Sequence, residues 1–175
     1  FQPRFSIHST NTDNTVTEPW MYSDLKDDIR KAIEFRYQLS PYLYSLTDRA
    51  HRTGLPIMEP MCSAFQNDVN CYEEGVDFMF GDSLLVANVV EKGAKTRRVY
   101  LPKGDTFYDF YTREAYEGGQ TIEIPVSLSS IPLFIKSWQP NRRPESASCV
   151  QPTRTASLIC TKTMAEPWIM NGAAI

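Results

Sequence analysis

The chain has 175 residues, 42% of them hydrophobic, and a formal net charge of −3 at pH 7. This length and apolar content are enough to bury a sizeable core. The negative charge and the lack of a concentrated lysine and arginine patch argue against a nucleic-acid partner, because phosphate binding needs clustered cations. No apolar run is long enough to cross a bilayer, so we expect no membrane partner either.

Cysteine usage points to a reducing compartment. The sequence has four cysteines: Cys62, Cys71, Cys149 and Cys160. Their spacings match neither a zinc site nor a dense disulfide framework. We therefore predict free, mostly buried thiols, no metal site and a cytoplasmic location.

The opening segment, residues 1–9, does not begin with Met and runs directly toward the start of a long helix. We therefore expect this sequence to begin inside a larger protein.

Residues 23–53 predict a long helix. Apolar residues recur close to helical spacing, and Ser23 stands where an N-cap residue belongs. Pro41 cannot donate a backbone hydrogen bond and clashes with the preceding turn, so we expect a kink there or a restart with Ser40 as a new cap. Gly54 then ends the helix.

From Phe78 onward, short β-rich runs separated by turn residues replace the helical period. Strands at this spacing without intervening helices indicate an antiparallel sandwich. The predicted strands are 84–90, 97–101, 106–110, 121–124 and 131–135, with turns at 91–94 and 117–119.

Several motifs in chain order give this sequence a family resemblance. The opening ends in an F-x-P-x-x-R-x-H-like segment at His8, although Ser6 departs from the arginine that many members carry there. The later motifs are Glu18-Pro-Trp20, the helix segment 36–44, Thr53-Gly-Leu-Pro56, Met58-Glu-Pro-Met61, the segment 80–87 and Ile131-Pro-Leu-Phe134. Together they resemble glycoside hydrolase family 31, the retaining α-glycosidases.

The resemblance implies a fold of mixed class, α/β plus all-β. Residues 1–55 would form the carboxyl-terminal end of a catalytic (β/α)8 TIM barrel, and residues 56–136 an antiparallel β-sandwich domain. It also implies that His8 hydrogen-bonds the sugar at the cleavage point. A neutral imidazole suits that role because it offers one donor and one acceptor.

The resemblance places the two catalytic Asp residues on barrel segments that precede Phe1, so we expect no catalytic residue in this chain. The acidic residues near its start have loop or helix-cap explanations; they are Asp13, Asp24, Asp27 and Asp28. His51 falls in the last turn of the predicted helix, where a cation complements the helix dipole. Phe1, Trp20 and Tyr22 could stack on a sugar or simply pack, and the sequence does not choose between these roles.

Residues 137–175 lose the strand alternation and carry no family motif. One interpretation is a disordered tail. The other, which we favour, is a frameshift near Ser137 or Trp138. Codons for 159–172, reread from one nucleotide earlier, are compatible with an acidic Tyr-Glu-Asp-Asp-Gly stretch that the resemblance leads us to expect.

The sequence therefore predicts a fragment of an enzyme that cleaves α-linked glycosides without a cofactor or metal. Its partner would be an α-linked oligosaccharide or glycoside, and the sugar, the choice between hydrolase and transglycosylase, and the oligomeric state stay open. The alternative is a non-catalytic β-sandwich module for carbohydrate binding or scaffolding, which would be self-sufficient in fold and would expose an aromatic platform.

Overall fold

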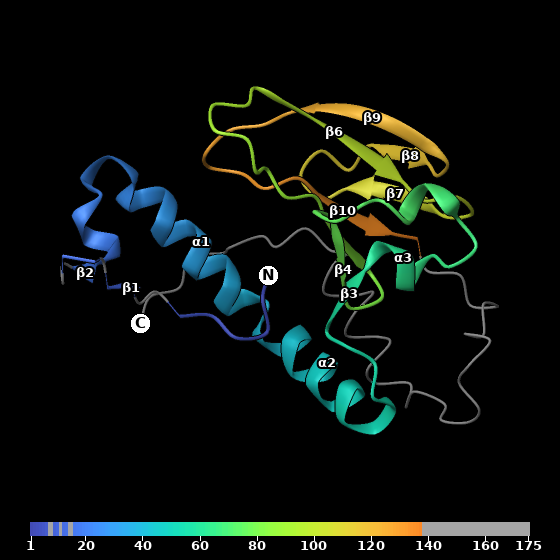
Figure 1. Ribbon diagram of the computed structural model, residues 1–175, viewed down its shortest axis with the longest axis horizontal. Helices are drawn as coiled ribbons and strands as arrows, with labels where there is room; N and C mark the ends of the chain where they lie inside the picture. Colours follow the sequence, from blue (N-terminus) through green and yellow to red (C-terminus); the bar gives the residue numbers. More distant parts are fainter. Residues whose placement is uncertain (7–8, 11, 14–15, 138–175) are drawn as a thin grey trace, which may run out of the picture. The chain divides into compact units, whose positions relative to one another are not determined.

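The computed structural model describes residues 1–6, 9–10, 12–13 and 16–137 of the chain (Figure 1). His8 and residues 138–175 lie outside the described residues, and with them Cys149, Cys160 and almost all of the predicted frameshifted segment.

The first part of the described chain is mostly helical. Two short strands, β1 (Ser9–Thr10) and β2 (Val16–Thr17), pair antiparallel. The helices that follow are η1 (Pro19–Met21), η2 (Ser23–Leu25), α1 (Lys26–Gln38) and α2 (Ser40–Thr53).

The predicted serine caps are wrong, although the interruption of the helix is right. Ser23 lies inside η2, and its hydroxyl donates to the Asp24 carboxylate at 3.2 Å rather than accepting from the backbone. Leu39, not Ser40, is the N-cap of α2. Pro41 then stands in the first turn of α2, where a missing N–H breaks no helical hydrogen bond.

Helix α2 ends as predicted. Gly54 has φ of 75°, a left-handed conformation that costs glycine little because it lacks Cβ. Its N–H donates to the Ala50 carbonyl at 2.9 Å, which satisfies one of the free carbonyls at the helix end.

The second part of the described chain is built of short strands. A six-stranded antiparallel sheet has the order β3-β4-β5-β10-β7-β8, and β6 pairs with β9 in a separate sheet. The strands are β3 (Met58–Pro60), β4 (Phe78–Phe80), β5 (Leu84–Val86), β6 (Thr96–Leu101), β7 (Thr106–Asp109), β8 (Ala115–Glu117), β9 (Gln120–Pro125) and β10 (Leu133–Lys136). Two short helices, α3 (Met61–Ala64) and η3 (Val69–Cys71), lie between β3 and β4 in the sequence.

All five predicted strands exist, but the one expected at 84–90 ends at Val86. The reason is a competing hydrogen bond: the backbone N–H of Asn88 donates to the Asp77 carboxylate at 3.2 Å instead of continuing the ladder. Strands β3, β4 and β8 were missed because three residues are too few to show alternation.

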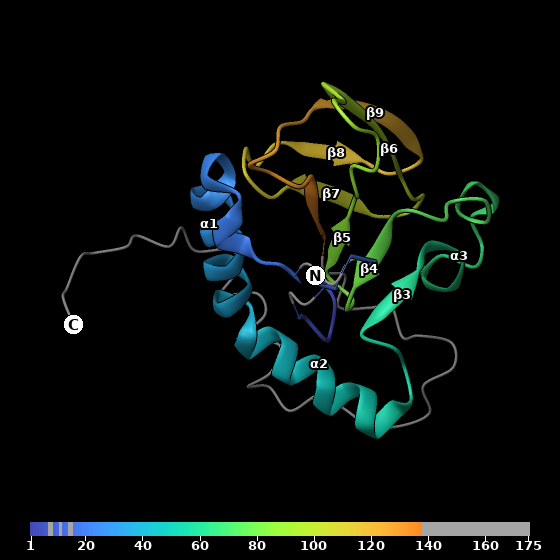
Figure 2. The same ribbon diagram turned by 60° about the vertical axis from the view of Figure 1, so that its left-hand side comes forward.

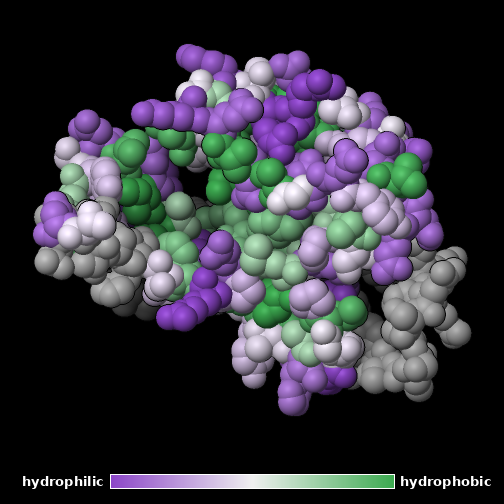
Figure 3. All heavy atoms as spheres, viewed as in Figure 1, coloured by the Kyte–Doolittle hydropathy of each residue, from purple (hydrophilic) through white to green (hydrophobic). Residues whose placement is uncertain are grey.

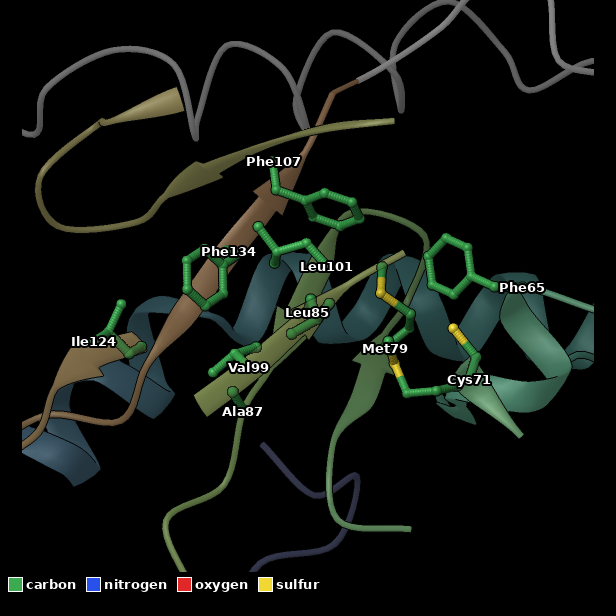
Figure 4. Close-up of a cluster of buried hydrophobic side chains, with 11 residues drawn as sticks. Phe65, Cys71, Met79, Leu85, Ala87, Val99, Leu101, Phe107, Ile124 and Phe134 are labelled. Atoms are coloured by element: carbon green, nitrogen blue, oxygen red, sulfur yellow. The ribbon is translucent and has the colours of Figure 1, made fainter. Parts of the chain in front are cut away.

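The main core lies between the two sheets. Leu85, Phe107 and Phe134 of the large sheet and Val99 and Leu101 of β6 are completely buried in it. Figure 4 shows their side chains converging from the separate strands. This double layer is the β-sandwich that the strand pattern predicts.

A second cluster covers the opposite face of the large sheet. Phe80, Leu84 and Leu133 form this cluster together with Leu46 of α2, and Phe35 of α1 packs against it. Figure 2 shows the ribbons of α1 and α2 beside the strands. Helix α1 buries none of its residues. Figure 3 accordingly shows hydrophobic side chains at the surface over α1.

Candidate functional site

The segment that leads to His8 is fixed by a side chain that the sequence analysis overlooked. Arg36 of α1 donates from Nη1 to the Gln2 carbonyl at 2.7 Å and from Nη2 to the Pro3 carbonyl at 3.1 Å. Its guanidinium carbon lies 5.2 Å from the centroid of the Phe5 ring. Together these contacts hold residues 2–5 against the helix, three positions before His8, which itself lies outside the described residues.

Arg36 opens the motif segment 36–44, but no pattern in that segment indicates contacts with residues 2 and 3. An arginine near the carboxyl end of an amphipathic helix is explained by the helix dipole alone. Its partners are backbone carbonyls more than 30 residues away, and carbonyl groups leave no trace in a residue pattern.

The three aromatic residues considered for sugar stacking, Phe1, Trp20 and Tyr22, divide into two kinds. Phe1 packs edge-on against Phe35 at 5.8 Å and Phe80 at 6.0 Å between ring centroids, so packing accounts for it. Trp20 and Tyr22 are exposed by 68% and 48%. Both residues are therefore accessible to solvent.

The acidic residues near the start occupy the positions that helix starts favour. Asp24 lies in the first turn of η2, and Asp27 and Asp28 lie in the first turn of α1. Carboxylates there interact favourably with the positive end of the helix dipole. Asp13 is exposed in the turn at 12–13.

Asp82 links a turn of the large sheet to helix α2. It lies in the 81–83 turn between β4 and β5, and its carboxylate forms an ion pair with Arg49 of α2. The pair joins the sheet to the helix. His51 lies two residues beyond Arg49 in the last turn of α2 and is exposed.

Three carboxylates are buried among the described residues: Asp68, Asp77 and Asp105. Asp68 accepts from the Tyr100 hydroxyl and the Lys103 backbone N–H, and Asp77 pairs with Arg97 at 2.9 Å. Asp105 contributes its backbone carbonyl to the Gly118 N–H. Asp68 and Asp77 therefore have structural partners within the sandwich.

The described residues offer few features of other kinds of site. They contain no group of three or more His, Cys, Asp or Glu side chains placed to hold a metal ion. None of the helices there is long and apolar enough to cross a membrane. Cys62 and Cys71 are both free thiols.

Comparison with known protein families matches two consecutive parts of the chain. Residues 1–46 match the TIM-barrel domain of glycosyl hydrolases family 31. Residues 54–137 match the C-terminal domain of the same family.

Relatives and solved structures agree with this match. Neutral alpha-glucosidase AB of Homo sapiens is 37% identical over 159 residues, covering 86% of this chain and 16% of the relative. Alpha-xylosidase of Saccharolobus solfataricus is 36% identical over 138 residues, covering 78% of this chain and 18% of the relative. The Flavobacterium johnsoniae GH31 dextranase complexed with glucose superposes with a TM-score of 0.66 at 42% identity, covering 70% of this chain and 15% of that one.

The present chain thus spans less than a fifth of the length of these relatives. The two matches follow one another along the chain: the first ends within α2, and the second begins at Gly54, directly after that helix. The chain therefore belongs to glycoside hydrolase family 31 and comprises the end of that family's TIM barrel followed by its C-terminal β-sandwich domain.

Proposed function

We propose that the protein containing this chain hydrolyses α-glycosidic bonds with retention, through a covalent glycosyl-enzyme intermediate. The consecutive matches to both family 31 domains carry this proposal. Relatives named alpha-glucosidase and alpha-xylosidase support α-linked glucosides or xylosides as the substrate class.

In this proposal the chain supplies one wall of the substrate pocket. Retaining glycosidases need two carboxyl groups about 5 Å apart. Asp68 and Asp77, the buried acids whose carboxylates are held by partners in the sandwich, have structural roles instead. The reacting carboxylates would then come from the preceding barrel segments.

A direct test uses residues 1–175 and a longer polypeptide that also carries the preceding barrel segments. We expect the chain alone to release no product from aryl α-glucoside, α-xyloside or α-N-acetylgalactosaminide substrates. The longer polypeptide should turn over at least one of them. Turnover by the chain alone would refute the placement of the catalytic pair, and an inactive, folded longer polypeptide would refute the hydrolase proposal.

We further propose that His8 donates a hydrogen bond to the sugar at the cleavage point. The Arg36 contacts support this role, because they fix the backbone that leads into His8. In the longer polypeptide, His8→Ala should lower kcat/KM by about 100-fold, the usual effect of removing a donor that acts in the transition state.

His51→Ala is the matched control, because His51 is exposed at the end of α2. It should leave kcat/KM within about twofold, as expected for a surface substitution. A His8→Ala enzyme with unchanged kcat/KM would eliminate the proposed contact.

A further inference from the structure

An open depression of about 640 Å³ lies where the segment around η3 meets strands β6 and β9. Its lining mixes aromatic and polar side chains, and Glu73 is the single charged residue among the described residues that line it. The residues used below are Val69, Asn70, Tyr72, Glu73, Tyr100 and Thr121.

A buried carboxylate fixes the polar part of this lining. Asp68 is 5% exposed, and its Oδ2 accepts from the Tyr100 hydroxyl at 2.7 Å and the Lys103 N–H at 2.8 Å. Its Oδ1 accepts from the backbone N–H and the Nδ2 of Asn70, both at 3.2 Å. Burial alone would raise the pKa of Asp68, but the hydrogen bonds from Lys103, Tyr100 and Asn70 lower it overall, so the carboxylate stays ionised at neutral pH.

The same network occupies the side-chain amide of Asn70. Nδ2 of Asn70 donates to both Asp68 and the Tyr100 oxygen, the latter at 3.0 Å. Both amide hydrogens are thereby engaged, which leaves the Asn70 side-chain carbonyl as an acceptor for a ligand. Because the amide is already held in place, little side-chain entropy remains to be lost on binding.

Tyr72 supplies a fixed aromatic surface. Its hydroxyl donates to the Gln66 carbonyl at 2.7 Å, which anchors the ring at its edge, while 58% of the residue stays exposed. Val69 beside it is 75% exposed. An anchored and exposed aromatic side chain is suited to stacking against a flat, partly apolar ligand.

We propose that this depression binds an α-linked gluco-oligosaccharide, with a pyranose ring stacked on Tyr72. A pyranose combines an apolar C–H face with hydroxyl groups that both donate and accept. The lining matches this chemistry: Tyr72 and Val69 offer apolar surface, while Asn70, Glu73 and Thr121 offer hydrogen-bonding groups. The negative charge of Glu73 disfavours a phosphorylated ligand. The choice of α-linked glucose rests on the proposed function.

The test is a calorimetric titration of the full chain with maltohexaose and with isomaltohexaose, using β-linked cellohexaose as the ligand control. Tyr72→Ala should weaken binding about tenfold, which corresponds to about 1.4 kcal/mol. Tyr72→Phe keeps the ring and should bind within about twofold of the parent chain. Tyr44→Ala is the matched control, since Tyr44 is a tyrosine 79% exposed on α2.

Backbone NMR of the unmodified chain locates the binding site without any substitution, so the proposal can still be tested if a Tyr72 variant does not fold. Bound oligosaccharide should shift the amide signals of Asn70, Tyr72, Gly119 and Thr121. The proposal would be overturned if neither α-linked ligand binds, or if the signal shifts are confined to other residues. It would also be overturned if cellohexaose binds equally well, or if Tyr72→Ala folds and binds as tightly as the parent chain.

These outcomes are separable from those of the hydrolase proposal. If the longer polypeptide cleaves α-glycosides while the depression binds no oligosaccharide, only the proposed binding site at the depression is refuted. If the longer polypeptide binds oligosaccharide at the depression but cleaves none, the hydrolase proposal is refuted. That result would favour a non-catalytic binding module.

Discussion

Asp77 is a buried carboxylate with only one of its oxygens hydrogen-bonded in the described structure. Oδ1 accepts from Arg97 at 2.9 Å and from the Asn88 N–H at 3.2 Å, while Oδ2 has no partner. Burial, and after it the negative charge of Glu74, raise the pKa of Asp77 to about 6 in spite of Arg97. Removal from water therefore outweighs the ion pair here.

This raised pKa predicts how stability depends on pH. The folded state binds the proton more tightly than the unfolded state does, so the Asp77 contribution is full below the unfolded pKa of 3.8 and is lost as pH rises through about 6. Between pH 5 and pH 7 the free energy of unfolding should therefore fall, by at most about 1.4 kcal/mol per pH unit from this group.

Urea unfolding of the chain at several pH values, alongside Asp77→Asn, measures this slope. Asparagine keeps an Oδ1 acceptor for Arg97 and Asn88 but does not titrate, so the slope should flatten. Asp82→Asn, at an exposed position, is the control and should keep the slope. The assignment fails if Asp77→Asn retains the full slope, or if the parent chain gains stability as pH rises.

Helix α2 is joined to the large sheet through the turn that follows β4. The Tyr42 hydroxyl donates to the Phe80 carbonyl at 2.9 Å, and Arg49 pairs with Asp82. Gly81 has φ of 66°, and a Cβ there would overlap the Tyr42 hydroxyl and the Leu46 side chain. Only glycine allows the turn to approach the helix this closely.

Gly81→Ala should therefore destabilise the chain by about 2–4 kcal/mol, the sum of left-handed backbone strain and overpacking. Gly54→Ala is the matched control, because Gly54 has φ of 75° with open space around it. It should cost only the backbone strain, about 1–2 kcal/mol. Equal losses for the two variants in urea unfolding would show that the contact between turn and helix does not constrain position 81.

Some features of the helices and strands could be predicted from the sequence, and others could not. The break at Pro41 and the stop at Gly54 were predictable because each follows from the geometry of one residue. The Ser23 cap was mispredicted because the Ser23 hydroxyl donates to the adjacent Asp24 carboxylate. The early end of β5 depends on Asp77, eleven positions before Asn88, and a local pattern cannot show such a bond.

At the level of the whole chain, family membership was predictable because short motifs survive in order across both domains. The hydrogen-bond partners around the candidate site could not be predicted. Arg36 binds backbone carbonyls 33 and 34 residues away, and the Asp68 network joins η3 to β6 over 32 residues. The role of His8, the domain boundaries at 55 and 136, and the frameshift near Ser137 stay predictions.

The stereochemistry of cleavage tests the central claim most directly. Proton NMR during hydrolysis of an aryl α-glucoside or α-xyloside by the longer polypeptide identifies the sugar anomer that is released first. A covalent double displacement predicts the α-anomer first, followed by slow mutarotation. Initial release of the β-anomer would mean single displacement, and it would contradict the assignment of this chain to a retaining α-glycosidase.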